Sequence, residues 1–271
     1  MGFVQDVVSV PKALIGVVHV RPLPGSPRWG GDMRDVIESA CEDASALAAA
    51  GFDALILENF GDAPFHREFA GRGAVAGLAA VGARVAELVQ IPLGINVLRN
   101  DALSAVAVAA AVGARFIRVN VHVGAAVCDQ GVVQGSAMAT MMAVRDMAPE
   151  LRVLADVHVK HASPLGGRGI GEEAADAVER ALASAVIVTG ASTGADTPLD
   201  DVAAVREAVP GTEVLVGSGV RKETVASALE MAEGVIVGSS LMEGGLSGNR
   251  IDATRARELV QAARTGGARG C

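Results

Sequence analysis

Polar side chains that could do acid–base chemistry recur where short apolar runs of this sequence end. Each run is rich in Val, Ile and Leu and is too short for a helix, so we predict a buried β-strand for each. In barrels of parallel strands, active sites lie at the carboxyl ends of the strands. The polar residues at these ends are His19, Glu58, Asn59, Asn96, Asn120, His122, Asp156, His158, Lys160, Thr189 and Ser218.

Two of these residues are carboxylates, and carboxylates at one site are typical of general acid–base catalysis. Glu58 could act as a general acid or base, as a metal ligand, or as a cap for the following loop. Asp156 could carry a pKa raised by burial, which suits proton transfer near neutral pH. A period of two also allows Arg118 and Asp156 to pair across neighbouring strands, so a structural ion pair is the alternative.

The nitrogen-bearing side chains add further candidates. His19 precedes a proline-stiffened loop and has little packing role there, so we predict that it is functional. Lys160 could form a Schiff base or clamp a phosphate, with an exposed loop lysine as the alternative. His158 could belong to the site or to the core. Asn120 is predicted to assist the chemistry, and Asn96, His122 and Asp129 complete the candidates, with Asp129 on a loop over the barrel mouth.

Two glycine-rich turns near the end of the chain predict an anion site. Glu213-Val-Leu-Val-Gly-Ser-Gly-Val220 and Gly234-Val-Ile-Val-Gly-Ser-Ser240 stop abruptly in Gly and Ser. Glycine lets the backbone approach an anion, to which N–H groups and hydroxyls then donate. The loops after strands 7 and 8 are the usual phosphate site of (β/α)8 barrels, although two tight turns without a ligand are the alternative. The residues assigned to this site are Thr189, Gly190, Gly217, Ser218, Gly219, Gly238, Ser239 and Ser240.

Strand-then-helix units repeat along the whole chain and must position these residues. Besides the two runs above, strands are predicted at 13–20, 53–58, 92–98, 115–122, 152–160 and 185–189. Helices are predicted near 32–51, 73–89, 101–113, 134–148 (with Met residues filling the core), 172–183, from 198, and 252–264. Asp32, Asp101, Thr197 and Asp252 are predicted N-caps.

This repeat predicts an α/β fold, a single-domain (β/α)8 TIM barrel. The domain spans 1–271, with the barrel at about 13–264, a short N-terminal extension and a Gly-rich C-terminal tail. The alternative fold, a doubly wound open sheet, is expected to have a Gly-rich turn after the first strand. This chain is rich in proline there, which favours the barrel.

Composition narrows the partners and the compartment. The 271 residues are 51% apolar and carry a net charge of −8. This negative charge gives no sign of the basic surface that binds nucleic acid. No apolar stretch is long enough for membrane insertion, and no signal peptide is recognised at the N-terminus. Three cysteines without pairing or metal spacing predict a reduced cytoplasmic protein.

A divalent metal would have to draw on Glu58, His19, Asp156 and His158, and these show no local ligand spacing. The use of a divalent metal ion therefore stays open, and no organic cofactor is expected. A homo-oligomer also stays open, since the Ala-rich helices show no obvious interface.

Several longer stretches resemble the BtpA/SgcQ family of TIM-barrel proteins from about residue 13 to 261. They are Ile15-Gly-Val-Val-His19 with Pro22-Leu-Pro-Gly-Ser-Pro27, Glu58-Asn-Phe-Gly-Asp-Ala-Pro-Phe65, Asn96-Val-Leu-Arg-Asn-Asp101, Phe116-Ile-Arg-Val-Asn120, Asp129-Gln-Gly131, Ala155-Asp-Val-His-Val-Lys-His-Ala162, Thr193-Gly194 and Gly217-Ser-Gly-Val220. The chain departs from relatives at Gly73-Ala-Val-Ala-Gly-Leu-Ala-Ala80, which lacks His and Thr, and at Met242, where Lys is common.

The resemblance implies a barrel similar to ribulose-phosphate-binding barrels, and it leaves the function open between two classes. The family takes its name from a cyanobacterial factor for photosystem I biogenesis, while other members look like sugar-metabolism or nucleosidase-like enzymes. We expect an enzyme that binds a small phosphorylated sugar or nucleotide-like substrate, with hydrolase, isomerase and lyase chemistry all open. The alternative is a non-enzymatic biogenesis or stability factor for a membrane complex.

Overall fold

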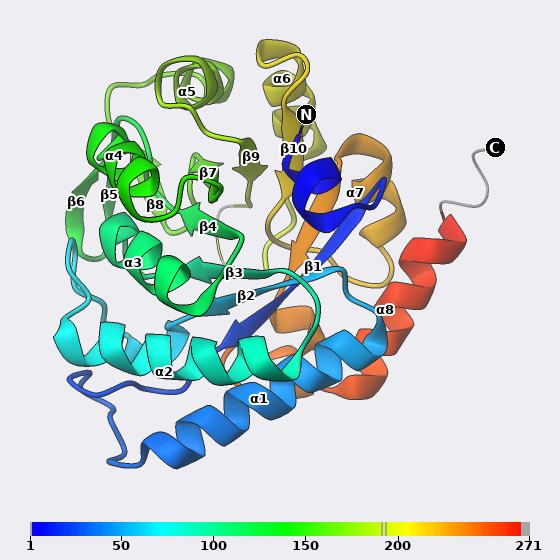
Figure 1. The fold of residues 1–271 in the computed structure, drawn as a ribbon. Helices are drawn as coiled ribbons and strands as arrows, with labels where there is room; N and C mark the ends of the chain where they lie inside the picture. The colour runs from blue at the N-terminus through cyan, green and yellow to red at the C-terminus, as the bar shows by residue number, and fades with distance from the viewer. Residues whose placement is uncertain (1, 191, 193, 267–271) are drawn as a thin grey trace.

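The apolar runs pair side by side in chain order and close into a barrel of parallel strands (Figure 1). The computed structural model describes residues 2–190, 192 and 194–266. The barrel strands are β1 (Ala13–His19), β2 (Ala54–Glu58), β3 (Leu93–Asn96), β4 (Phe116–Val119), β7 (Arg152–Val157), β9 (Ala185–Val188), β10 (Glu213–Val216) and β11 (Gly234–Val237). β1 pairs with both β2 and β11, so the two ends of the chain close the sheet. The predicted (β/α)8 barrel is confirmed.

Helices cover the outside of this barrel, as Figure 1 shows, and α1 and α8 lie side by side there. They are α1 (Met33–Ala50), α2 (Arg72–Leu88), α3 (Ala102–Val112), α4 (Ala137–Met147), α5 (Ile170–Ala175), α6 (Leu199–Ala208), α7 (Val225–Met231) and α8 (Ala253–Gly266). The described residues include no helix with the length and apolar character that crossing a membrane requires.

Most of the predicted helix caps are confirmed. Asp32, Asp101 and Asp252 each accept a hydrogen bond from a backbone N–H in the first turn of their helix. The prediction for Thr197 was wrong, because Pro198 takes the N-cap position of α6. The Thr197 hydroxyl instead donates to the carbonyl oxygen of Ser218 at 3.0 Å, and so serves the barrel mouth.

The segment around Asp129, predicted as a loop, is a β-hairpin beside the barrel. Its strands are β5 (Ala125–Cys128) and β6 (Gly131–Gln134), and β8 (Ala162–Pro164) adds to the other edge of β5. Gly131 at φ +94° permits the tight turn. The following helix therefore begins at Ala137 rather than at 134. Three of its methionines were wrongly assigned to the core, since Met138, Met142 and Met147 are exposed.

The N-terminal extension closes the base of the barrel. Phe3 and the π-helical turn Val4–Val8 (η1) pack into the cluster formed by inward-facing barrel residues. The Phe3 ring meets Phe116 edge-on at 4.9 Å between centroids. Glu213 accepts a hydrogen bond from the Val4 N–H at 2.7 Å. This segment seals the end of the barrel opposite the predicted site.

Candidate active site

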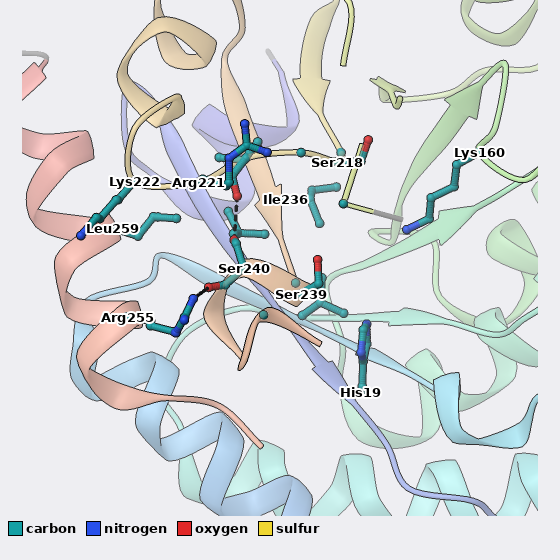
Figure 2. Close-up of a pocket in the computed structure, with 18 of the residues that line it drawn as sticks. His19, Lys160, Ser218, Arg221, Lys222, Ile236, Ser239, Ser240, Arg255 and Leu259 are labelled. Atoms are coloured by element: carbon teal, nitrogen blue, oxygen red, sulfur yellow. Dashed lines mark hydrogen bonds between the residues drawn. The ribbon is translucent and has the colours of Figure 1, made fainter. Parts of the chain in front are cut away.

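A cavity of about 510 Å³ lies at the carboxyl ends of the barrel strands. We divide the described residues that line it into three parts. The central part comprises His19, Glu58, Arg118 and Lys160. The cradle comprises Gly217, Ser218, Gly219, Gly238, Ser239 and Ser240, and the outer part comprises Arg221, Lys222, Arg255 and Glu258. Figure 2 shows Ser239 and Ser240 between Lys160 on one side and Lys222 with Arg255 on the other.

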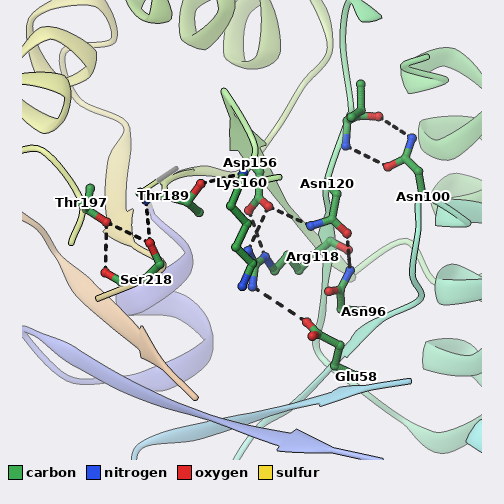
Figure 3. A network of polar contacts seen from close by, with 12 residues as sticks. Glu58, Asn96, Asn100, Arg118, Asn120, Asp156, Lys160, Thr189, Thr197 and Ser218 are labelled. Carbon is green, nitrogen blue, oxygen red and sulfur yellow. Dashed lines mark hydrogen bonds and ion pairs between the residues drawn. The ribbon is translucent and has the colours of Figure 1, made fainter. Parts of the chain in front are cut away.

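A buried polar network forms the floor of the central part (Figure 3). Arg118 donates to Asp156 through Nε and Nη2, both at 2.9 Å. Asn120 donates to the same carboxylate at 2.8 Å and accepts from Asn96 at 3.1 Å. Buried charges of opposite sign hold each other in place in this way, and Asp156 keeps the pKa of the Arg118 guanidinium raised despite burial.

Asp156 is occupied by this network and does not line the cavity. Its side chain is fully buried, and its oxygens accept from Arg118 and Asn120. The structural alternative of an Arg118–Asp156 pair is therefore the one the geometry supports. Glu58 is the carboxylate that lines the central part, with Oε2 4.0 Å from Arg118 Nη1.

His19 is held as a neutral imidazole at the end of β1. Its ring stacks on Phe60 at 4.1 Å between centroids, and its Nδ1 accepts from the Gly248 N–H at 3.2 Å. Burial lowers the pKa of His19 to about 4, although Glu58 opposes this shift. Because Nδ1 accepts, the proton of the neutral ring is on Nε2, which lies 3.7 Å from Glu58 Oε1.

Lys160 reaches the central part from the loop after β7. Its backbone N–H donates to Thr189 Oγ1 at 3.1 Å, and its carbonyl accepts from Arg99 at 2.7 Å. Burial and the nearby Arg118 charge lower the pKa of its amine, against the opposing effect of Glu58. A lysine whose pKa is lowered is a better nucleophile or base at neutral pH.

Hydroxyl groups tie the loops of the cradle together. Ser218 Oγ accepts from the Gly190 N–H at 2.6 Å and donates to the carbonyl of Ala195 at 3.1 Å. Ser240 Oγ donates to the carbonyl of Val220 at 2.6 Å. These bonds use the Ser218 and Ser240 hydroxyls for loop geometry. Thr189 and Gly190 likewise support the neighbouring loops and are absent from the described lining of the cavity.

Backbone donors remain for an anion at the cradle. Within the described residues, the N–H groups of Gly219, Val220, Ser239 and Ser240 find no hydrogen-bond acceptor. Gly219 has φ +70°, and a Cβ there would lie 2.4 Å from the Asp196 Cα, so only glycine fits. All four residues line the cavity, and backbone N–H groups without a partner beside one cavity are typical of phosphate sites.

Three predicted residues lie away from the cavity. The His122 ring is buried and bonds the Ala181 carbonyl at 2.9 Å. His158 Nε2 faces Glu173 at 3.8 Å. Asp129 is exposed in the hairpin turn. Thr193 of the family-like stretch lies outside the described residues.

Sequence reasoning missed the whole outer part of the cavity. Arg221 and Lys222 follow Gly217-Ser-Gly-Val220 directly, which was the available signal, whereas Arg255 comes from α8. It also missed the stacking of Phe60 on His19. Among the described residues, no group of three His, Cys, Asp or Glu side chains could hold a metal ion. Of the four residues considered as metal ligands, His158 lies beside Glu173 outside the cavity and Asp156 is bound by Arg118.

Two enzymes are among the solved structures with a similar fold. Phosphoribosyl anthranilate isomerase from Thermus thermophilus aligns with a TM-score of 0.58 at 14% identity, covering 93% of this chain and 98% of the isomerase. Tryptophan synthase from Mycobacterium tuberculosis aligns with a TM-score of 0.61 at 20% identity, covering 94% and 92%. At 14% and 20% identity, the similarity shows a common fold and nothing further.

Sequence relatives are much closer. Photosystem I biogenesis protein BtpA of Synechocystis is 43% identical over 92% of this chain and 87% of its own length. An uncharacterized protein of Thermococcus kodakarensis is 44% identical over 93% and 95%. The sgc region protein SgcQ of Escherichia coli is 30% identical over 96% and 97%. The model of the BtpA family matches residues 10–265, so this chain belongs to the BtpA family.

Proposed function

We propose that this protein is an enzyme that performs acid–base chemistry on a small phosphorylated sugar or nucleotide-like substrate. The observation that carries the proposal is that one cavity joins a titratable cluster, Glu58, His19 and Lys160, to backbone donors for an anion. The similarity in fold to known enzymes supports the proposal that this protein is an enzyme. The type of reaction is inferred from the residues of the site.

The charge of the cavity supports an anionic substrate. Among the described lining residues, the cations are Arg118, Lys160, Arg221, Lys222 and Arg255, and the carboxylates are Glu58, Glu223 and Glu258. His19 adds no charge near neutral pH, because its pKa is about 4. Cations therefore outnumber carboxylates in the described lining, while Asp156, Asp196 and Asp252 pair with three of these cations from outside it. An excess of lining cations in a chain of net charge −8 favours an anionic ligand at that place.

The central part favours proton transfer next to a carbonyl group. Glu58 would remove or return a proton, while the Nε2–H of neutral His19 would donate to the carbonyl oxygen of the substrate. Arg118 would stabilise the negative charge that develops, and Asp156 with Asn120 would hold Arg118 in place. Lys160 would act as a second base or as a Schiff-base amine.

Isomerase or lyase chemistry is therefore favoured over glycoside hydrolysis. Hydrolysis at an anomeric carbon uses two carboxylates that face the substrate. Glu58 lines the central part, whereas Asp156 lies under Arg118 with no exposed side-chain surface.

A matched pair of substitutions in the cradle tests the proposal. Ser239→Asp and Ser239→Asn have nearly the same shape and differ in charge, and Ser239 lines the cavity. In thermal unfolding with sugar phosphates and nucleotides, we expect a ligand at about 100 times its Kd to stabilise the protein by about 2.7 kcal/mol. Ser239→Asn should keep most of this stabilisation, and Ser239→Asp should lose it. A panel that stabilises neither the parent chain nor Ser239→Asn would refute the proposal.

The name of the Synechocystis relative favours a second candidate, a biogenesis factor for a membrane complex. That role would leave the barrel mouth dispensable. The photosystem I content of Synechocystis cells that lack their own BtpA can distinguish the enzyme from the biogenesis factor. If this chain restores photosystem I and Glu58→Gln restores it equally, the second candidate is supported. If Glu58→Gln fails while its protein accumulates normally, the barrel mouth is required.

A further inference from the structure

We propose that the outer part of the cavity binds a second phosphoryl group, so that the ligand is a phosphoric anhydride, such as a sugar or nucleoside diphosphate. The inference rests on the proposed function, since the cradle would hold the inner phosphoryl group. The outer phosphoryl group would then meet Arg221, Lys222 and Arg255.

The three cations are attached to the cradle by short connections. Arg255 Nη1 donates to the carbonyl of Ser240 at 3.4 Å. Ser240 Oγ donates to the carbonyl of Val220, the residue before Arg221. An anion on the Ser240 N–H would therefore have the guanidinium of Arg255 nearby, and Figure 2 shows Arg255 and Lys222 on the side of Ser240 away from Lys160.

Each cation has a carboxylate partner, exposed for Arg221 and Lys222 and half-buried for Arg255, that a phosphoryl group could replace. Arg221 Nη1 lies 2.7 Å from Asp196, Lys222 Nζ lies 3.0 Å from Glu258, and Arg255 Nε lies 3.6 Å from Asp252. The cationic side chains are 43%, 54% and 46% exposed, so a ligand can reach them. The pairs of Lys222 and Arg255 are single exposed contacts, which contribute little stability. Arg221 meets Asp196 through two hydrogen bonds, and a phosphoryl group can accept paired hydrogen bonds from a guanidinium in the same way.

The cavity also extends beyond the central part and the cradle. Such a ligand would span the central part and the cradle, where Glu58 and the Ser239 N–H lie, and would leave the outer part unused. The cavity of about 510 Å³ falls within the range of about 300–1,000 Å³ that is common for small-molecule sites. An anhydride would use all three parts.

Inorganic phosphate and pyrophosphate, compared by calorimetry in metal-free buffer, test this inference. We expect pyrophosphate to bind about tenfold more tightly than phosphate, as one added charge-assisted contact allows. Arg255→Gln and Lys222→Gln should each remove most of this preference and change phosphate binding by less than about twofold. Arg257→Gln is the control, because Arg257 is exposed on the same helix and donates to Thr254 at 3.2 Å outside the cavity.

The outcomes separate this inference from the proposed function. Equal affinities for the two anions would overturn the second phosphoryl site and leave the cradle intact. An equal loss of preference in Arg257→Gln would show general charge attraction and would also overturn it. Failure of both anions to bind would refute the cradle, and the inference would fall with it.

Discussion

At the scale of the residue, His19 and Lys160 both have a pKa below the ordinary value because the barrel mouth buries them. Burial disfavours the charged form of both, and Arg118 adds to the effect on each. Glu58 opposes the shift in both cases, without reversing it. The site therefore offers a neutral donor and an amine of lowered basicity next to one carboxylate, which is a set suited to proton transfer.

The first prediction concerns stability in acid. Since the pKa of His19 is about 4 in the folded state and 6.5 ordinarily, the unfolded chain binds the proton first as the pH falls. The contribution of His19 to the free energy of unfolding is then complete above about pH 6.5. It declines toward pH 4, by about 3 kcal/mol in total. Urea unfolding between pH 4 and 7 should show this decline in the parent chain, and a smaller one in His19→Asn. If the free energy of unfolding declined equally with pH in the parent chain and in His19→Asn, the prediction would be wrong.

The second prediction concerns Lys160 and uses the other lysines as internal controls. The chain contains three, Lys12, Lys160 and Lys222. The pKa of Lys160 is lowered, while the hydrogen bond and charge of Glu258 raise the pKa of Lys222. Only the neutral amine reacts with pyridoxal phosphate, so at pH 7.5 mass spectrometry after borohydride should find Lys160 modified ahead of Lys222. Preferential modification of Lys222 would refute the assigned environment.

At the scale of the element, the sequence predicted positions well wherever a strand continues. Arg118 and Asp156 lie within β4 and β7, so the period of two paired them correctly. The same period was extended to His122 and His158, but the strands end at Val119 and Val157. His158 has φ +48°, which turns the chain out of the strand direction. Beyond the end of a strand, loop geometry and not pleating decides where a side chain lies.

The outer part of the cavity could not be predicted for a different reason. Arg221 and Lys222 follow β10, whereas Arg255 belongs to α8, which follows β11, and the pairing of β10 with β11 brings the three residues to one place. The position of Arg221 and Lys222 directly after Gly217-Ser-Gly-Val220 was a local signal, but no pattern in the sequence links Arg255 to them. The glycine-rich ends of β10 and β11 were recognisable, because the backbone requirement there is local to each turn.

The third prediction tests the N-terminal segment as a plug for the barrel base. Phe3 is buried against Phe116, whereas Phe69 is 52% exposed. Phe3→Ala would leave a cavity in a packed cluster, and we expect it to lower the free energy of unfolding by about 3–5 kcal/mol. Phe69→Ala should change it by less than about 0.5 kcal/mol. Urea unfolding of both variants measures this difference, and similar small effects would show that the segment is dispensable.

At the scale of the whole molecule, closure joins the two ends of the chain. β1 pairs with β11 in register from Ala13 with Gly234 to Gly16 with Val237. The last barrel strand is therefore needed to cover the first one, and neither half of the barrel has a complete sheet by itself. A closed sheet has no exposed edge that could pair with another chain.

The fourth prediction follows from this closure and addresses the expected single domain. If the barrel unfolds as one unit, two probes placed far apart should report the same transition. The chain has a single tryptophan, Trp29, on the loop before α1, so its fluorescence reports one local region. Far-ultraviolet circular dichroism reports all the helices. We expect both signals to give the same midpoint in urea. A shortened chain that ends at residue 233, before β11, should lack a cooperative transition. Separate midpoints, or cooperative unfolding of the shortened chain, would show that part of the barrel folds independently.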